Sequence, residues 1–206
     1  VVPPGTDPRY TPDPSLRAAE PTVLAVGRFM PHKRFDLLVR EVAALREHVP
    51  GTRLVIVGGG FERVVLEQLI SDLDAGDWVT MAGHVTDDEL ADHYRRAWVV
   101  ASSSAREGWG MTISEAAACG TPAVATDISG HRDSIVDGVT GILGPSDGTI
   151  RSQLERVLTD AELREKLGAN ALARAETMTW AATAARTLEA VIADARSRRR
   201  RRIRLG

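Results

Sequence analysis

The sequence contains one cysteine, Cys119, and only two lysines, Lys33 and Lys166, among its 206 residues. A single cysteine excludes an internal disulfide and a multi-cysteine zinc site, and it fits a reducing compartment. No apolar run approaches the roughly 18 residues of a membrane-spanning helix, and no signal-peptide pattern is present. We therefore expect a cytoplasmic protein in which Cys119 is a small core residue. The chain begins with Val1 rather than Met, which leaves open whether it is an excised piece.

Basic residues are scarce outside the C-terminal segment "RSRRRRRIRLG", which holds seven arginines. Without them, 19 basic residues remain against 28 acidic ones, although the whole chain has a net charge of only −2. An acidic body argues against nucleic acid as a partner. For residues 196–206 we expect a disordered, solvated tail. One alternative is attraction to an anionic membrane surface, which would make the protein peripheral on the inner face of the membrane. Nucleic-acid binding by the tail is the least favoured alternative.

Apolar strand patterns alternate with amphipathic helix patterns along most of the chain. Residues 1–20 are rich in proline and predict an extended linker, and 147–195 predict helices. Alternation of this kind predicts an α/β fold, a Rossmann-like doubly wound parallel sheet, over residues 21–195. The expected strands are 22–27, 53–60, 78–83, 98–104, 122–126 and, at an edge, 141–144.

Ligands of such sheets bind beyond the carboxyl ends of the strands. In "GRFMPHKRFD", Arg28 follows the first strand and Lys33 precedes a helix, and two cations at this edge suit a diphosphate. Ordinary surface charge is the alternative. The run "GGGFER" lacks the third glycine of a dinucleotide fingerprint, so a tight strand-to-helix turn explains it better than NAD binding.

The stretch "AREGWGMTISEAAACGTPAVAT", residues 105–126, is the most informative one. Gly108 and Gly110 free the backbone ahead of a helix that Thr112 or Ser114 would cap, and such an N-terminus suits a phosphate. Glu107 precedes this helix, and Glu115 lies about one turn inside it. Two carboxylates beside an anion site make sense if the phosphate is flanked by hydroxyl groups, as in a nucleotide sugar. Capping alone would not explain Glu107 and the two glycines.

This stretch resembles the signature of the retaining GT-B glycosyltransferases of the glycosyltransferase family 4 type (group 1), in which seven residues separate two glutamates. The blocks "RLVIVGGGFER", "VTMAGHVTDDELADHYRRAWVVASSS" and "DSIVDGVTGIL" match the family in the same order. The resemblance implies the C-terminal, donor-binding half of a two-domain enzyme. Its missing N-terminal domain would carry the acceptor site and the catalytic histidine, so we expect this chain alone to be inactive.

The resemblance also implies roles for individual residues. Arg28 and Lys33 would hold the diphosphate and stabilise its developing charge, and Glu107 would bind hydroxyls of the donor sugar. Glu115 would grip the ribose. The remaining expected contacts are the phosphate loop, Gly108, Trp109, Gly110, Met111 and Thr112, and the loop beside the base, Gly83, His84 and Val85. The substrate would be a nucleotide-diphosphate sugar, with UDP or GDP as the expected carrier, and neither a cofactor nor a metal is expected.

Several positions depart from the family pattern or invite other interpretations. Arg34 stands where glycine is common and would crowd or supplement the phosphate site. We expect His131 to be a loop residue rather than a catalytic base, and His84 to be a surface histidine. Trp180 should anchor the last helix in a core.

The main alternative function is a non-catalytic nucleotide-binding or regulatory module of the same fold, against which the intact glutamate pair speaks. A phosphorylase of the pyridoxal type would need a suitable lysine, and neither Lys33 nor Lys166 has that context. No epimerase motif is evident. An oxidoreductase is disfavoured because the fingerprint glycines are missing.

Overall fold

The computed structural model describes the backbone of residues 2–204 and the side chains of residues 2–196. Six parallel strands form one sheet in the order β3-β2-β1-β4-β5-β6. This order confirms the predicted doubly wound sheet, and β6 is the expected edge strand. The strands are β1 (Thr22–Val26), β2 (Arg53–Val57), β3 (Val79–Gly83), β4 (Val99–Ser102), β5 (Ala123–Thr126) and β6 (Gly141–Gly144).

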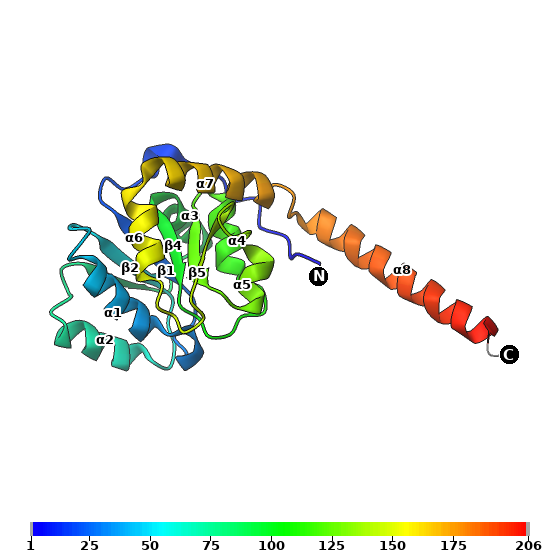
Figure 1. Ribbon diagram of the computed structural model, residues 1–206, viewed down its shortest axis with the longest axis horizontal. Helices are drawn as coiled ribbons and strands as arrows, with labels where there is room; N and C mark the ends of the chain where they lie inside the picture. The colour runs from blue at the N-terminus through cyan, green and yellow to red at the C-terminus, as the bar shows by residue number, and fades with distance from the viewer. Residues whose placement is uncertain (1, 205–206) are drawn as a thin grey trace.

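Helices cover both faces of the sheet (Figure 1). Successive strand residues point to opposite faces, so Val23 belongs to one core and Leu24 to the other. The first core packs under α1 (Phe35–Leu45), α2 (Arg63–Asp72) and α6 (Arg151–Thr159). The opposite face carries α3 (Asp87–Arg96), α4 (Met111–Ala118) and α5 (Ser129–Ser134), and α7 (Ala161–Ala175) packs on α4 and α6.

Cys119 follows α4 and is 1% exposed in the core beneath α3 and α4, as expected. Burial raises the pKa of its thiol to about 12. A thiol with so high a pKa carries almost no thiolate at neutral pH, so Cys119 is a packing residue.

The strand order reverses between β1 and β4, which pair with each other in the middle of the sheet. Chain connections leave this point in opposite directions, and a crevice opens beyond the carboxyl ends of the two strands. The loops that follow β1 and β4 are 27–34 and 103–110. They contain Lys33 and Glu107, so the topology alone brings the two predicted polar segments together.

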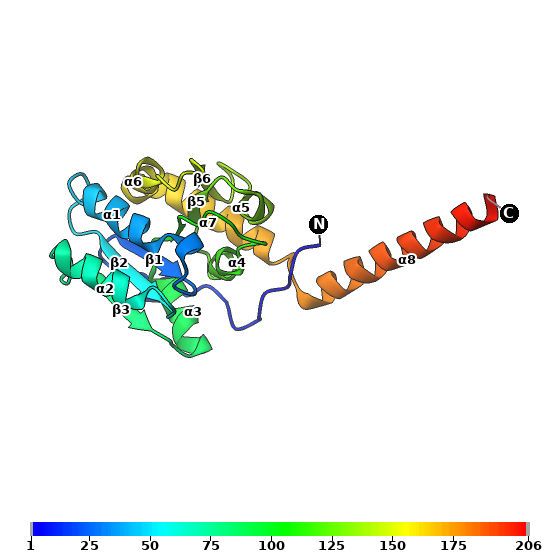
Figure 2. The same ribbon diagram turned by 90° about the horizontal axis from the view of Figure 1, so that it is seen from below.

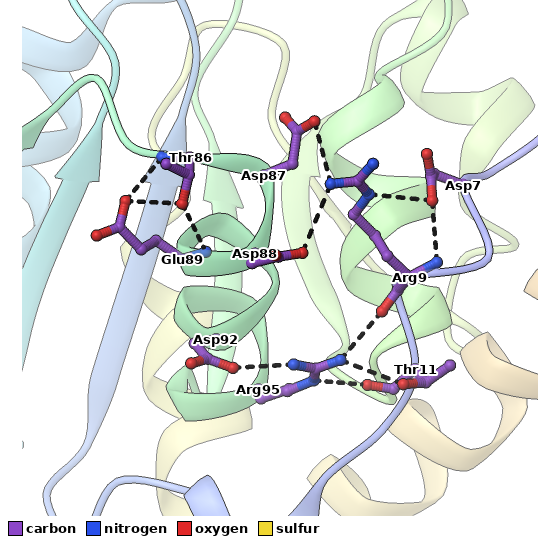
Figure 3. A network of polar contacts seen from close by, with 9 residues as sticks. All are labelled: Asp7, Arg9, Thr11, Thr86, Asp87, Asp88, Glu89, Asp92 and Arg95. Carbon is purple, nitrogen blue, oxygen red and sulfur yellow. Dashed lines mark hydrogen bonds and ion pairs between the residues drawn. The ribbon is translucent and has the colours of Figure 1, made fainter.

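The N-terminal segment, residues 2–20, is extended apart from one short 3₁₀ turn, η1 (Pro14–Leu16), and is called the linker below after its predicted role. It lies along α3, where Arg95 donates to the carbonyl oxygens of Arg9 and Thr11 and to Asp92 (Figure 3). Farther toward the N-terminus, the amide of Thr6 donates to the Met178 carbonyl at 2.9 Å. The linker is therefore held against both α3 and the segment that precedes the last helix.

The last helix, α8 (Trp180–Arg204), projects away from the body of the molecule (Figures 1 and 2). Trp180 is 56% exposed at its start, so the prediction that it anchors this helix in a core is wrong. Met178, which is 5% exposed, makes the buried contact instead, because the chain turns outward after it.

The backbone of residues 196–204 continues α8, in contrast to the predicted disordered tail. Arginine is a good helix former, and no proline or glycine interrupts the helix before Gly206. The side chains from residue 197 onward lie outside the described residues, so attraction of the tail to a membrane surface stays a prediction. Within the described part of the chain, no helix has the length and apolar character needed to cross a bilayer.

Candidate functional site

The glycine run after β2 is a structural turn, as the sequence indicated. Gly58 has a φ of +127°, and a Cβ added there would lie 2.0 Å from the carbonyl oxygen of Gly27. A Cβ at Gly60 would lie 2.8 Å from the amide of Phe29. The loops after β1 and β2 thus approach more closely than side chains allow, and this packing accounts for glycine at both positions.

The loops after β1 and β4 are joined by a backbone hydrogen bond of 2.7 Å from the Ala105 amide to the His32 carbonyl. His32 and Lys33 belong to the 3₁₀ turn η2 (Pro31–Lys33). The Lys33 ammonium lies 2.5 Å from Oε1 of Glu107, which also accepts a hydrogen bond from the Ser104 hydroxyl at 2.8 Å. Both partners of the ion pair are mostly buried, with 20% and 15% of their side chains exposed.

Arg28 and Arg34 belong to the same loop as Lys33 and differ in what they contact. Arg28 is exposed, and among the described residues its guanidinium has no hydrogen-bond or ion-pair partner. The guanidinium of Arg34 instead donates to the carbonyl of Asp147 at 2.8 Å. Arg34 therefore braces the loop after β6, and its effect on the phosphate site stays a prediction.

Arg34 also adopts a left-handed conformation, with φ of 52° and ψ of 44°, at the start of α1. A residue with a Cβ is strained in this region, whereas glycine is not. The left-handed backbone conformation thus explains why glycine is common at this position in the family that the sequence resembles.

The glycine loop ends at Gly110, which has a φ of +90° and is the N-cap of α4 without a side-chain capping bond. The predicted capping by Thr112 or Ser114 is wrong, because the Ser114 hydroxyl accepts a hydrogen bond from the Trp109 indole at 2.9 Å. Since α4 begins at Met111, the amides of Met111 and Thr112 belong to the first turn and have no acceptor within the helix. They are available to an anion.

Glu115 lies one turn into α4, as the sequence predicted, and is partly buried. The Tyr94 hydroxyl of α3 donates to its Oε2 at 2.6 Å. Burial raises the pKa of the Glu115 carboxyl above its ordinary value, while the Tyr94 hydrogen bond opposes this shift. The pKa of the Tyr94 phenol is raised well above its ordinary value, chiefly by burial, so the phenol keeps its proton.

The loop expected beside the base follows β3. Gly83 has a φ of +71°, and its carbonyl accepts a hydrogen bond from the Gly58 amide at 2.7 Å. The exposed imidazole of His84 lies over Gly59, where an added Cβ would meet it at 2.5 Å. Val85 packs partly buried on the core beneath α3 and α4. His84 is thus a surface histidine, as expected, and it covers the glycine turn.

His131 differs from its prediction as a loop residue, because it lies in α5 and is fully buried. Its Nδ1 is 2.8 Å from the Thr126 carbonyl, and its Nε2 is 3.3 Å from the Ser102 hydroxyl. Burial lowers the pKa of the imidazole. The preceding Gly130 lies against the backbone of Glu107, since an added Cβ would be 2.3 Å from the Glu107 carbonyl oxygen. This close packing draws α5 beneath the site and buries His131.

An open hollow of about 390 Å³ lies in front of the ion pair, lined by His32, Arg106, Glu107 and Gly108. Neither His32 nor Arg106 was predicted as a site residue from the sequence. Both could have been proposed from the sequence, because His32 precedes Lys33 and Arg106 precedes Glu107, which are predicted site residues. Among the described residues, no group of three His, Cys, Asp or Glu side chains is placed to hold a metal ion.

The profile of a known family, described as Glycosyl transferases group 1, matches residues 8–174. The chain is 39% identical to a D-inositol 3-phosphate glycosyltransferase of Kineococcus radiotolerans, over 92% of this chain and 50% of that protein. It is 35% identical to a GDP-mannose-dependent alpha-(1-6)-phosphatidylinositol monomannoside mannosyltransferase of Mycolicibacterium smegmatis, over 72% of this chain and 43% of that protein. The chain therefore spans about half the length of these curated relatives.

Solved structures show the same fold. A sucrose-phosphate synthase of Thermosynechococcus elongatus superposes with a TM-score of 0.84 at 30% identity, over 95% of this chain and 52% of that one. The Anabaena protein Alr3699/HepE, solved in complex with UDP-glucose, superposes with a TM-score of 0.81 at 23% identity. That superposition covers 92% of this chain and 56% of the Anabaena chain.

Proposed function

Because the chain belongs to the group 1 glycosyl transferases, we propose that it is the donor-binding half of a retaining glycosyltransferase that transfers a hexose from a nucleoside diphosphate. The observation that carries the proposal is the arrangement around α4. Lys33 pairs with the carboxylate of Glu107 just ahead of the N-terminus of α4, and a second carboxylate, Glu115, lies one turn into that helix. Arg28 belongs to the same loop as Lys33, and its guanidinium has no partner among the described residues.

The cationic groups suit the diphosphate. Arg28 and Lys33 would bind its oxygens together with the amides at the start of α4. As the bond to the sugar breaks, negative charge accumulates on the diphosphate, and fixed positive groups stabilise it. These residues would thereby supply the electrostatic role that a metal ion fills in other enzymes.

The carboxylates suit hydroxyl groups. Glu107 would accept hydrogen bonds from the donor sugar, and Glu115 would accept them from the ribose. A glycoside hydrolase also uses two carboxylates, but it needs both of them at the scissile bond. Here Lys33 holds Glu107 and Tyr94 holds Glu115, on two different elements, which favours two separate hydroxyl contacts.

UDP and GDP are the proposed carriers. One relative is named for its dependence on GDP-mannose, and the Anabaena neighbour was solved with UDP-glucose. The same relative is named for a phosphatidylinositol substrate, which agrees with a protein that works at a membrane surface. We propose that the rest of the enzyme, an N-terminal domain, supplies the acceptor site.

Calorimetric titration of this chain with UDP, GDP, ADP and NAD tests the proposal. Binding of one nucleoside diphosphate, weakened by about tenfold or more in Glu115→Ala, is expected. Binding of NAD alone would refute it, and so would the absence of binding by all three diphosphates.

Two finer parts of the proposal, the need for a further domain and a retaining reaction without a metal, are tested by measuring sugar transfer. Steady transfer of sugar by this chain alone would show that no further domain is required. In the complete enzyme, we expect full activity after treatment with EDTA and a product with the anomeric configuration of the donor. Loss of activity that Mg²⁺ or Mn²⁺ restores would refute metal independence.

A further inference from the structure

Tyr94 connects the site to the linker. It is completely buried between α3 and α4, and its hydroxyl donates to Glu115 at 2.6 Å. On its other side, the ring of Tyr10 packs edge to face on it, with 5.7 Å between ring centroids and 79° between planes. Tyr10 belongs to the linker, so a single side chain touches both the linker and a predicted ligand-binding carboxylate.

Arg9 and Thr11, the residues on either side of Tyr10 in the chain, attach the linker to α3 (Figure 3). Arg95 donates to the Thr11 carbonyl at 2.8 Å, on the C-terminal side of Tyr10, and to the Arg9 carbonyl at 3.0 Å, on its N-terminal side. On the N-terminal side, the Arg9 guanidinium lies 3.2 Å from Asp87 at the start of α3. Tyr10 is therefore fixed by contacts with α3, the helix that carries Tyr94.

The hydrogen bond from Tyr94 has two consequences for Glu115. Among the described residues, no other side chain donates to this carboxylate, so Tyr94 alone fixes its direction. Occupation of Oε2 leaves Oε1 as the acceptor for a ligand hydroxyl. A buried carboxylate without this donor would be more easily protonated and free to rotate, and either change weakens it as an acceptor.

We propose that Tyr94 is a positioning residue, which orients Glu115 toward the ribose of the donor and is itself held in place by Tyr10 of the linker. The inference rests on the proposed function and deepens it. It makes the contact with the ribose dependent on the segment that leads into the domain, so that a displaced linker weakens recognition of the nucleotide without touching it.

The test compares two ligands in each variant. Calorimetry measures the dissociation constants of the nucleoside diphosphate that the wild-type chain binds best and of its 2′,3′-dideoxy analogue. The ratio of the two constants reports only the contacts with the ribose hydroxyls. A variant that is merely destabilised weakens both ligands equally and leaves this ratio unchanged.

The wild-type chain is expected to prefer the ribonucleotide by at least about tenfold, and Tyr94→Phe to reduce the preference by about three- to tenfold. Tyr10→Ala is expected to reduce it less. Tyr10→Phe is the matched control, because it keeps the ring, and the Tyr10 hydroxyl has no partner among the described residues. In a Glu115→Ala background, Tyr94→Phe should have no further effect.

The outcomes separate the two claims. A wild-type preference that Tyr94→Phe leaves unchanged overturns the role of Tyr94 while the proposed function stands. If Tyr94→Phe lowers the preference equally with and without Glu115, Tyr94 does not act through that carboxylate, and the inference also fails. If the wild-type chain shows no preference or binds neither ligand, the ribose contact of Glu115 and this inference fail together.

Discussion

The Lys33 ammonium lies 2.5 Å from Oε1 of Glu107 across the gap between two loops. In the proposed complex, Lys33 would bind the diphosphate and Glu107 the sugar. Lys33 and Glu107 therefore bind each other through the same groups that would bind the ligand. A diphosphate has to compete with Glu107 for Lys33, and a sugar hydroxyl has to compete with Lys33 for Glu107.

This competition predicts opposite effects of Glu107→Gln on two ligands. Because the substitution frees Lys33, affinity for the nucleoside diphosphate should rise by about threefold to tenfold. The additional affinity contributed by the sugar should fall, so the nucleotide sugar loses its advantage over the diphosphate. Calorimetry with both ligands measures the two effects. Lys33→Ala is the companion variant, and it should weaken both ligands by about tenfold or more.

The two glycines of the loop should differ in their tolerance of alanine. Gly110 has a φ of +90°, and an added Cβ would lie 3.1 Å from Ile113 and 3.3 Å from Ser134. Gly110→Ala is therefore expected to lower the free energy of unfolding by about 1 to 2 kcal/mol. Gly108 has open space around an added Cβ, so Gly108→Ala should stay within about 0.5 kcal/mol of wild type. Urea denaturation of both variants checks this, and equal losses would contradict the assigned backbone role.

Ligand binding should weaken as the pH falls. This weakening should begin at a higher pH than a glutamate with an ordinary pKa would cause. Burial raises the pKa of Glu115, so its carboxylate is lost as the pH falls through that raised value. The Kd for the nucleoside diphosphate should then rise over the same interval in wild type and stay flatter in Glu115→Gln. Since both proteins share every other titrating group, identical profiles would exclude Glu115 as the source.

The raised pKa of Glu115 also predicts that Glu115→Gln is more stable than wild type. A carboxyl whose pKa is higher in the folded than in the unfolded chain destabilises the fold above that folded pKa. The penalty shrinks as the pH falls toward the ordinary value. Glu115→Gln should consequently melt above wild type at pH 8, with the difference narrowing toward pH 4. A lower melting temperature at pH 8 would show that the Tyr94 contact outweighs the cost of burying the charge.

His131 should make the fold sensitive to acid. Its pKa is lowered by burial, so the unfolded chain binds the proton more readily than the folded one. Stability attributable to this group is complete above the unfolded pKa of about 6.5 and is lost as the pH falls toward the folded value. Melting temperatures between pH 8 and pH 5 should fall less steeply in His131→Gln than in wild type. If the melting temperatures of both proteins fall equally with pH, groups other than His131 cause the acid sensitivity.

Much of this architecture could be predicted because it depends on local patterns. Alternating apolar strands and amphipathic helices determine the doubly wound sheet, and the order of the strands then decides which loops meet. Arg28 and Lys33 were predicted as site residues because two cations lie at the ligand-binding edge of the sheet, and Glu107 and Glu115 because their spacing around a glycine loop resembles the family motif.

The missed features depend on tertiary contacts. The burial of His131 follows from the close approach of Gly130 to Glu107, which no local pattern announces. The role of Tyr94 is hidden because it looks like an ordinary core residue of an amphipathic helix. Trp180 was misplaced because a large aromatic at the start of a helix usually marks a core contact, whereas here α8 leaves the body.

The central claim is that one nucleoside diphosphate binds with its phosphates at Arg28 and Lys33 and its ribose at Glu115. A crystal structure of this chain with the diphosphate that binds in calorimetry tests it most directly. The account predicts phosphate oxygens within hydrogen-bond distance of Lys33 and of the first amides of α4, with a ribose hydroxyl on the Glu115 oxygen that Tyr94 leaves free. A nucleotide bound elsewhere, or bound here with its ribose away from Glu115, would contradict it.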